Sequence, residues 1–446
     1  MPGPSIRNWE LARLLSQRHD VTLAAPGPAG PQSSEFKVVG WGTGSVADLV
    51  VHSDIVKVSG YLLNWHPQIV EARYLVVDLY DPFPLENLHM HEKKSLEERY
   101  RTAVHDRDVQ TNLIRAGDVF LCASERQRDF WTGWLAAAGR VNPYMHELDP
   151  GLGRFLLVVP FGVPDEPPKA MPPRYRGVVP GIADDDLIVV WGGGIWNWFD
   201  PLTLIRAVHQ TRDRLPKLRL VFPATSVPSP DVPPMHMLEA ARSLSHELGL
   251  TGNRVFFGSS WIPYAEHGAI LLESDIGTSL HQSSVETRFS FRTRILDYLW
   301  AGLPIIATEG DSMADLIRDE KLGAVVPVGD VEAVVAALVE LGSDPSRRRA
   351  CAERSRTAAE RFRWSVAAQP LVDYCSAPYQ APDRLAVVTE TMATSPYGTL
   401  PVQRDRSRLL KRAVQVLGDE GPRSLIAKSS AYLRKRSSPK PRRGNR

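Results

Sequence analysis

The residues best suited to bind an anionic ligand follow a predicted strand that ends near Leu280. A polar loop with His281 and Glu286 comes after this strand, and a helix is expected to begin near Ser290. The helix should end at Gly302, because glycine readily adopts the left-handed conformation that closes many helices. We therefore expect the polar loop and the start of this helix to face a ligand.

The first turn of this helix carries the groups that a diphosphate requires. Phe291, Arg292, Thr293 and Arg294 lie in or beside the turn, where backbone N–H groups have no partner within the helix. Arginines form charge-assisted hydrogen bonds with phosphate. Asp297 follows about one turn later, where a carboxylate can accept hydrogen bonds from two ribose hydroxyls. An ordinary surface helix remains the alternative, with Arg294 and Asp297 forming an ion pair at a spacing of three residues.

A glycine cluster, Gly192-Gly193-Gly194, follows the predicted strand Leu187–Trp191 and precedes a helix capped by Asp200. Glycines at the carboxyl end of a parallel strand let a ligand approach the backbone, and the helix start offers N–H donors to phosphate. A tight turn would use the same glycines. Gly193 and Gly194 are therefore candidate ligand-binding residues, but the cluster alone does not distinguish the two interpretations.

Carboxylates that could act on a second substrate end another predicted strand, Tyr74–Leu79. Asp78 and Asp81 lie at its carboxyl end, and His89 follows. A general base, or a group that orients an acceptor hydroxyl, is expected at such a position. Asp81 is the preferred catalytic candidate, although the dipeptide Asp81-Pro82 is also common in turns.

The stretch from the polar loop to the next strand resembles the donor-site signature of the retaining glycosyltransferases of family 4, roughly E-G-F-G-x3-x-E-A-x-A-x-G-x-P. When the two are aligned on Gly302 and Pro304, Asp297 takes the place of the second glutamate, which in that family holds the ribose. The place of the first glutamate falls on Phe289, and Glu286 lies three residues earlier. Either a longer loop gives Glu286 that catalytic role, or the carboxylate is absent.

The resemblance extends over the whole second half and has a second departure. Asn253–Tyr264 is similar to the strand and loop that read the nucleotide base in that family. The segment Gly192–Phe199 lacks the Arg and Lys that usually neutralise the diphosphate, and we expect Arg292 and Arg294 to replace them. The resemblance implies a GT-B fold, in which two Rossmann-like domains face a cleft. It also implies transfer of a hexose or similar sugar from a nucleoside diphosphate to a hydroxyl, with retention.

The elements that must position these residues read as an α/β fold of doubly wound parallel sheets, because short apolar runs alternate with longer amphipathic stretches. Six strands are expected in each half, and each half should form one such sheet. The first six are Val21–Ala25, Phe36–Gly40, Ile55–Ser59, Tyr74–Leu79, Val119–Ala123 and Leu156–Val159. The second six are Leu187–Trp191, Leu218–Phe222, Arg254–Gly258, Asp275–Leu280, Pro304–Thr308 and Ala324–Val326. Helices are expected over Ile6–Arg18, Pro201–Arg214, His236–Leu248 and Val331–Leu341.

Composition suggests where the domains meet. Seven of the residues 160–180 are proline, which indicates an extended connector. We expect an acceptor-side domain at 1–160, a linker at 161–180, a nucleotide-sugar-binding domain at 181–375, and a loose segment with a basic tail at 376–446. A doubly wound domain normally opens with a strand, whereas this sequence opens with a turn and a helix. We therefore hypothesise that a central strand precedes Met1.

Charge and cysteine usage indicate the surroundings of the protein. Residues 401–446 carry fourteen Lys and Arg against three acids, a net charge of +11, whereas the whole chain has +2. Helices expected at 408–417 and 423–436 would be amphipathic and basic, suited to an anionic membrane surface, to the protein body or to no partner at all. Three scattered cysteines and the absence of an apolar leader indicate a cytoplasmic protein, peripheral on the inner face of a membrane if the tail binds there.

The sequence therefore predicts a glycosyltransferase that takes a nucleotide sugar as donor and a saccharide or lipid-linked acceptor, in cell-surface polysaccharide or glycolipid assembly. No Asp-x-Asp pair lies near the donor residues, so we expect no metal and no further cofactor. Nothing indicates nucleic-acid binding. Two alternatives stay open: a catalytically inactive binding partner with the same fold, and a sugar-nucleotide epimerase. The nucleotide base, the sugar, the acceptor and the oligomeric state are not determined by the sequence.

Overall fold

The computed structural model describes residues 3–25, 32–41, 46–225, 235–259 and 262–384, all of which belong to one compact unit. No helix within these ranges is long and apolar enough to cross a membrane. Both helices predicted for the basic tail lie outside the described residues.

The second half of the chain contains the single six-stranded sheet that its sequence predicts. All neighbouring strands are parallel, in the order β12-β11-β10-β7-β8-β9. The strands are β7 Leu187–Val190, β8 Leu218–Phe222, β9 Val255–Phe257, β10 Ile276–Ser279, β11 Ile305–Thr308 and β12 Gly323–Val326. The chain runs outward from β7 through β8 and β9, then returns to β10 on the other side of β7. The boundary between β7 and β10 is therefore the switch point, where open parallel sheets bind ligands at their carboxyl edge.

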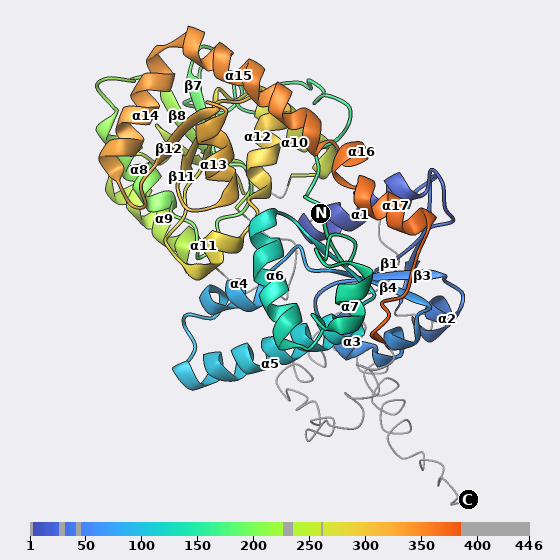
Figure 1. Ribbon diagram of the computed structural model, residues 1–446. Helices are drawn as coiled ribbons and strands as arrows, with labels where there is room; N and C mark the ends of the chain where they lie inside the picture. Colours follow the sequence, from blue (N-terminus) through green and yellow to red (C-terminus); the bar gives the residue numbers. More distant parts are fainter. Residues whose placement is uncertain (1–2, 26–31, 42–45, 226–234, 260–261, 385–446) are drawn as a thin grey trace, which may run out of the picture. The chain divides into compact units, whose positions relative to one another are not determined.

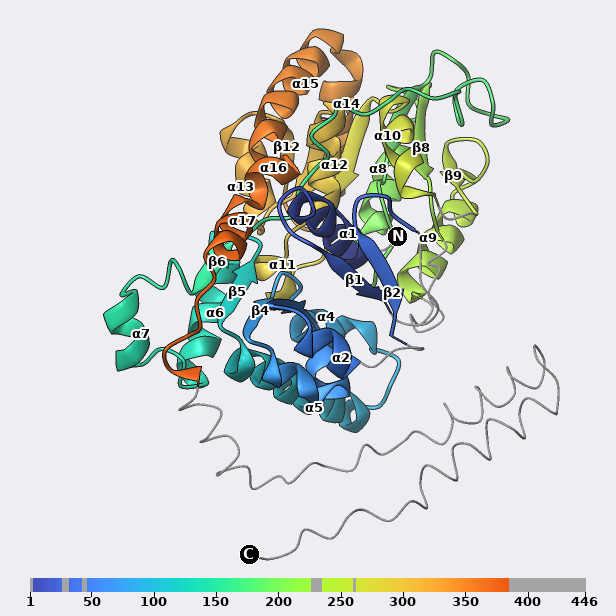
Figure 2. The ribbon, with the colours of Figure 1, turned by 90° about the vertical axis from the view of Figure 1, so that its right-hand side faces the viewer.

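Helices cover both faces of this sheet (Figures 1 and 2), as burial of apolar strands on both sides requires. One face packs against α8 Pro201–Gln210, α9 His236–Glu247 and α14 Val331–Ser343. The other packs against α10 Tyr264–Leu272, α12 Thr293–Ala301, α13 Ser312–Asp319 and α15 Pro345–Ala359. The predicted helices in this half are confirmed to within a few residues of their ends.

The first half also contains six parallel strands, but they form two sheets, so the prediction of one sheet is wrong for the residues described. One sheet pairs β1 Thr22–Ala25 with β2 Lys37–Gly40. The other has the order β3-β4-β5-β6, with β3 Ile55–Val58, β4 Tyr74–Asp78, β5 Val119–Cys122 and β6 Leu156–Val158. Among the described residues β1 and β3 each pair on one side only, which divides the sheet. The hypothesis of a further central strand stays a prediction.

The described residues of the first half form seven helices, of which α4 begins after β4 and α6 begins after β5. They are α1 Gly3–Leu15, α2 Val46–Val51, α3 Leu62–Trp65, α4 Phe83–Met90, α5 Leu96–Ala116, α6 Glu125–Ala137 and α7 Pro143–Leu148, with a 3₁₀ turn at Pro67–Glu71. The first helix is held by a buried ion pair, because Arg7 donates to Asp78 at 2.8 Å and to the carbonyls of Val159 and Pro160.

Among the described residues no helix or strand lies between β6 and β7, a stretch that includes the segment 161–180. Val163 of the connector forms a bridge with Arg363, so the connector and the closing segment run side by side. That closing segment comprises a 3₁₀ turn at Glu360–Phe362, α16 Trp364–Ala367 and α17 Gln369–Ser376.

The residues after α17 return to the first half of the chain, so the prediction of a loose segment from 376 onward is wrong as far as residue 384. Arg140 donates two hydrogen bonds to Asp383, at 2.9 and 2.8 Å, and both side chains are almost completely buried. Arg384 forms a second ion pair with Asp118. A buried ion pair is weak evidence for high stability, but its loss leaves an unpaired charge inside the protein.

We therefore predict that Asp383→Asn lowers the free energy of unfolding by about 3–5 kcal/mol, because Arg140 would keep its charge without a carboxylate partner. The matched control is Asp54→Asn, which removes an exposed ion pair with Arg73 and should cost less than about 1 kcal/mol. Urea unfolding followed by circular dichroism measures both. Equal effects of the two substitutions would contradict the role given to the Arg140–Asp383 pair.

Candidate functional site

The glycine loop and α12 meet at the switch point of the six-stranded sheet, where Tyr298 joins them. The Tyr298 hydroxyl accepts a hydrogen bond from the N–H of Gly192 at 2.7 Å and donates one to the carbonyl of Thr278 at 2.8 Å. It therefore connects the end of β7 with β10 beneath the loop. Gly193 has φ +106°, a conformation that other residues rarely adopt, so the glycine sequence sets the shape of this turn.

The predicted helix begins at Thr293, three residues later than expected, and the loop predicted before it contains a short helix of its own. A short helix, α11 Val285–Phe289, places Glu286 in a helical turn instead of a loop, and Ser284 caps it by accepting from the N–H of Thr287. The chain then becomes extended at Ser290, and α12 begins only at Thr293. The N-cap of α12, Arg292, makes no side-chain cap hydrogen bond. The N–H groups of Thr293 and Arg294 have no partner among the described residues and remain available to a ligand, whereas that of Ile295 donates to the carbonyl of Arg292.

Glu286 and Arg292 form a buried bidentate pair. Both guanidinium hydrogen bonds to the carboxylate measure 2.9 Å, and the Glu286 side chain is completely buried. Asp311 lies 3.6 Å from Nε of Arg292 and 3.5 Å from Nε2 of His281. These four side chains form one buried polar cluster behind the start of α12.

Arg294 is directed into the protein and lies over aromatic rings. Its guanidinium carbon is 3.9 Å from the ring centre of Phe199, and one of its nitrogens donates to the carbonyl of Gly194 at 2.9 Å. Burial lowers the pKa of Arg294 to about 10. The Nη1 atom is buried without a hydrogen-bond partner among the described residues. Arg294 thus keeps one donor beside the glycine loop. Arg292 gives its two terminal nitrogens to Glu286, and its buried Nε has no hydrogen-bond partner among the described residues.

The remaining candidate residues of α12 and its approach differ in exposure. Asp297 is partly exposed and accepts a hydrogen bond from Nε2 of His267 at 3.1 Å. Burial disfavours a charged His267, but the Asp297 carboxylate outweighs it, and the pKa of His267 is raised. Thr293 is partly exposed, and Phe291 packs its side chain against the core. Phe291 therefore offers a ligand its backbone and not its ring.

The acceptor-side carboxylates have two different environments. Asp78 is enclosed by Arg7 and Lys57; burial opposes its charge, but the two cations prevail and hold its pKa well below the usual range. Asp78 is therefore a structural ion-pair partner and does not accept protons near neutral pH. Asp81 instead shares a hydrogen bond with Glu86, on the first turn of α4.

Asp81 and Glu86 behave as a pair that retains a proton. Removal from water raises the pKa of both carboxyl groups, and the charge of Glu286 raises them further. The pKa of Glu86 is raised well above its ordinary value, and the charge of Asp81 contributes to this shift. The two carboxyl groups therefore share one proton through their hydrogen bond. Three carboxyl groups from the two halves of the chain thus lie close together.

Near these carboxyl groups, α6 and the end of α4 contact the second half of the chain. Gln127 donates to the carbonyl of Phe289 at 3.0 Å, and the Phe130 and Phe289 rings lie 4.8 Å apart. Asn197 donates to the carbonyl of His89 at 3.3 Å. The ring of His89 does not join the carboxyl groups, because it pairs with Glu92.

Sequence reasoning missed Glu86, His267 and Tyr298. Glu86 lies five residues after Asp81, a spacing that predicts no contact until α4 is known to start at Phe83. His267 is separated from Asp297 by thirty residues, and no local pattern joins them. Tyr298 does leave a signal in the sequence, namely the glycines that make room for it. A Cβ added at Gly277 would lie 2.5 Å from its ring, and one added at Gly192 would lie 3.0 Å from it. Two glycines next to strands of this sheet indicate a bulky neighbour.

Comparison with known protein families matches the part of the chain that contains the glycine loop and α12. The profile of the family described as glycosyl transferases group 1 matches residues 186–344, which include the glycine loop, α11 and α12. The chain is 24% identical over 218 residues to the putative glycosyltransferase EpsD of Bacillus subtilis (strain 168), which is 46% of this chain and 51% of that protein. It thus spans about half the length of this relative.

Solved structures show the same fold at low sequence identity. Sucrose-phosphate synthase from Thermosynechococcus elongatus superposes with a TM-score of 0.61 at 14% identity, covering 84% of this chain and 94% of that chain. Anabaena Alr3699/HepE in complex with UDP and glucose gives a TM-score of 0.57 at 14% identity, covering 83% and 96%. Likeness at these identities concerns the fold.

The Asp81–Glu86 pair generates a prediction about stability and pH. A carboxyl group whose pKa is raised on folding stabilises the folded state below its unfolded pKa, and this contribution is lost as pH rises through the folded value. The free energy of unfolding should therefore fall as pH rises from about 4 toward 8. Glu86→Gln keeps a donor to Asp81 without the second charge, so the fall should become shallower. Urea unfolding at a series of pH values measures it, and an unchanged slope would contradict the shared proton.

Proposed function

Since residues 186–344 form a glycosyl transferases group 1 domain within a GT-B fold, we propose that the protein is a retaining glycosyltransferase that binds a nucleotide sugar at the switch point. The acceptor hydroxyl would approach from the first half of the chain, beside Asp81. The observation that carries this proposal is the meeting of three features at one edge: the glycine loop after β7, the uncapped start of α12, and the carboxyl groups Asp81, Glu86 and Glu286.

The donor would be held by backbone donors and one arginine. The first N–H groups of α12 suit a diphosphate, since the positive end of the helix dipole favours an anion. Nη1 of Arg294 adds a donor beside Gly194. Asp297, one turn along α12, would accept from two ribose hydroxyls, with His267 fixing the position of its carboxylate. Glu286, oriented by Arg292, would face the sugar.

The chemical step would be supported by charge stabilisation on the leaving diphosphate. The glycosidic bond to the diphosphate breaks while the acceptor oxygen bonds to the anomeric carbon from the same face. The acceptor proton would pass to the departing phosphate oxygen or to Asp81 once the pair with Glu86 has lost its proton. Helix N–H groups aimed at the diphosphate stabilise the charge that develops there. The location would be the cytoplasm or the inner face of a membrane, with cell-surface polysaccharide or glycolipid as product.

One feature favours a second candidate, an inactive protein that binds a nucleotide sugar. Phe289 stands where the resembled family has its first glutamate, and Glu286 is held by Arg292 on both carboxylate oxygens. A carboxylate so fully engaged has less freedom to assist a reacting sugar. This candidate predicts donor binding without turnover.

The donor site is tested by Asp297→Ala. We predict that one of UDP, GDP, dTDP or CDP raises the melting temperature of the full chain by several degrees at a hundredfold excess over Kd, because ligand binding then adds about 2.7 kcal/mol. The shift should disappear in Asp297→Ala and persist in Asp319→Ala, an exposed aspartate on α13. A thermal-shift titration measures it, and equal shifts in both variants would remove Asp297 from the site.

Catalysis is tested by Asp81→Asn. We predict that turnover falls at least about a hundredfold while the nucleotide-induced thermal shift stays intact, since a general base or hydroxyl-orienting group contributes about 10²–10⁴-fold. Nucleotide release from the matching nucleotide sugar, with water or an added sugar as acceptor, supplies the rate. Asp319→Asn is the control. Proton NMR of the product reports the anomeric configuration, and inversion would contradict the proposed stereochemistry. Donor binding with no turnover in the unchanged protein would favour the inactive candidate.

A further inference from the structure

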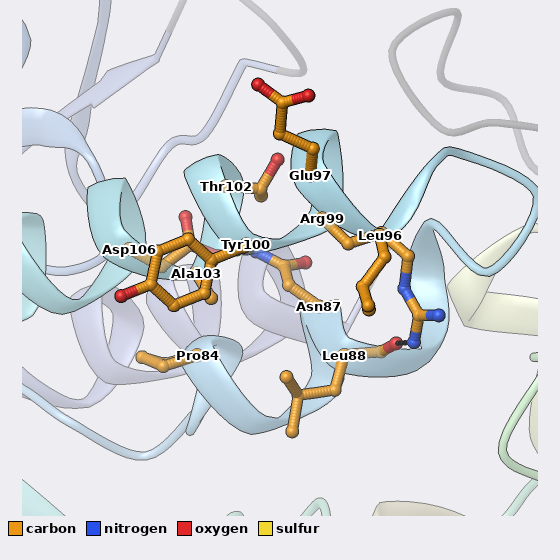
Figure 3. A pocket seen from close by; sticks show the side chains of 10 residues that line it. All are labelled: Pro84, Asn87, Leu88, Leu96, Glu97, Arg99, Tyr100, Thr102, Ala103 and Asp106. Atoms are coloured by element: carbon orange, nitrogen blue, oxygen red, sulfur yellow. Dashed lines mark hydrogen bonds between the residues drawn. The ribbon is translucent and has the colours of Figure 1, made fainter.

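A groove between α4 and α5 lies next to the proposed acceptor side and has no assigned role. It encloses about 690 Å³, a volume typical of sites for small molecules. Figure 3 shows its lining, in which Leu96 and Tyr100 reach from α5 toward Pro84 and Leu88 of α4. Leu96 is 78% exposed and Tyr100 is 70% exposed, so most of the surface of these large side chains has no partner in the described structure.

The polar side chains of the lining are already engaged with the protein. Asp106, at the floor, accepts from Tyr61 at 2.5 Å and from Asn87 at 2.8 Å. Arg99 donates to the carbonyl of Leu88, a bond that Figure 3 marks. The two others behave alike: Glu97 pairs with Arg101, and Thr102 donates to the carbonyl of Glu98. Apart from the exposed hydroxyl of Tyr100, these hydrogen-bonding groups have partners, so an occupant meets mainly apolar surface.

The groove and the carboxyl pair lie on neighbouring faces of α4. Glu86, of the carboxyl pair, and Asn87, of the groove, are consecutive residues, and consecutive residues of a helix point about 100° apart. Pro84 lines the groove at the start of α4, three residues after Asp81. A molecule whose head reaches Asp81 and Glu86 can therefore lay an attached chain along α4 and α5.

Two lysines lie at one end of the groove, in a loop that also carries Glu92. Lys93 and Lys94 lie in the loop that joins α4 to α5, next to the lining residues Leu88 and Leu96. Both lysines are exposed, and neither forms an ion pair with the residues that the structure describes. Exposed lysines beside apolar side chains suit the anionic surface of a lipid bilayer.

We propose that the α4–α5 groove binds the apolar chain of a lipid-linked acceptor, whose sugar head reaches Asp81 and Glu86. The inference rests on the proposed function and names its acceptor class. A linear hydrocarbon chain lies along Pro84, Leu88, Leu96 and Tyr100, and the loop with Lys93 and Lys94 faces the anionic lipid surface from which the chain enters.

The test uses the full chain and monomeric alkyl β-glucosides of increasing chain length, from hexyl to decyl, below their micelle-forming concentrations. Isothermal titration calorimetry should give an affinity that rises about fourfold per added methylene, until the groove is filled. Tyr100→Ser should weaken decyl glucoside binding about tenfold, since it removes the ring that covers the chain. Tyr144→Ser is the matched control, because Tyr144 is 63% exposed on α7, outside the groove.

A second variant fills the groove instead of opening it. Ala103→Trp places a large ring in the lining and should abolish the chain-length dependence, while the nucleotide-induced thermal shift reports that the fold is intact. Affinity independent of chain length, or equal loss in Tyr100→Ser and Tyr144→Ser, would overturn the inference. Nucleotide binding without chain binding rejects the groove alone. Chain binding without nucleotide binding rejects the proposed function and leaves the groove as a lipid site.

Discussion

The hydroxyl of Tyr298 is the contact on which the candidate donor site depends. It joins Gly192, at the end of β7, to Thr278 in β10, and so holds α12 beneath the switch point of the sheet. The ring fits only because Gly277 has no side chain, since a Cβ there would lie 2.5 Å from it. The uncapped start of α12 is thereby set opposite the glycine loop. The positions of the residues that would touch a ligand therefore depend on the packing of core residues beneath them.

The charged residues around this contact divide into those that are satisfied within the protein and those that are not. Arg292 is held by Glu286, and Arg7 and Lys57 by Asp78, so these groups mainly fix elements in place. Among the described residues the Asp81–Glu86 pair forms no salt bridge, and burial outweighs the charge of Arg292 near Glu86, so the pair retains a proton. Buried charge without a partner is costly, and shared protonation is the usual response. An unpaired acidic group is also what proton transfer requires.

Helix α4 links the functions proposed for the first half. Its first turn carries Glu86, its carboxyl end contacts the second half through the carbonyl of His89, and its other face lines the apolar groove with α5. A substrate bound in the groove would therefore be positioned relative to the donor by one rigid element. Sites built on helices hold their geometry more closely than sites built on loops.

The sequence by itself determined the strands and the fold class, because the apolar runs that form strands act locally. It also singled out the glycine loop, Asp297 and the closure of α12 at Gly302, which depend on short spacings. Only the tertiary structure decided that α11 and α12 are separate, that Asp78 is neutralised by Arg7, and that Glu86 rather than His89 partners Asp81. It also decided that residues up to 384 return to the first half through Arg140 and Asp383. Each of these depends on pairing between residues distant in the chain or on the burial of a charge, and neither leaves a periodic trace in the sequence.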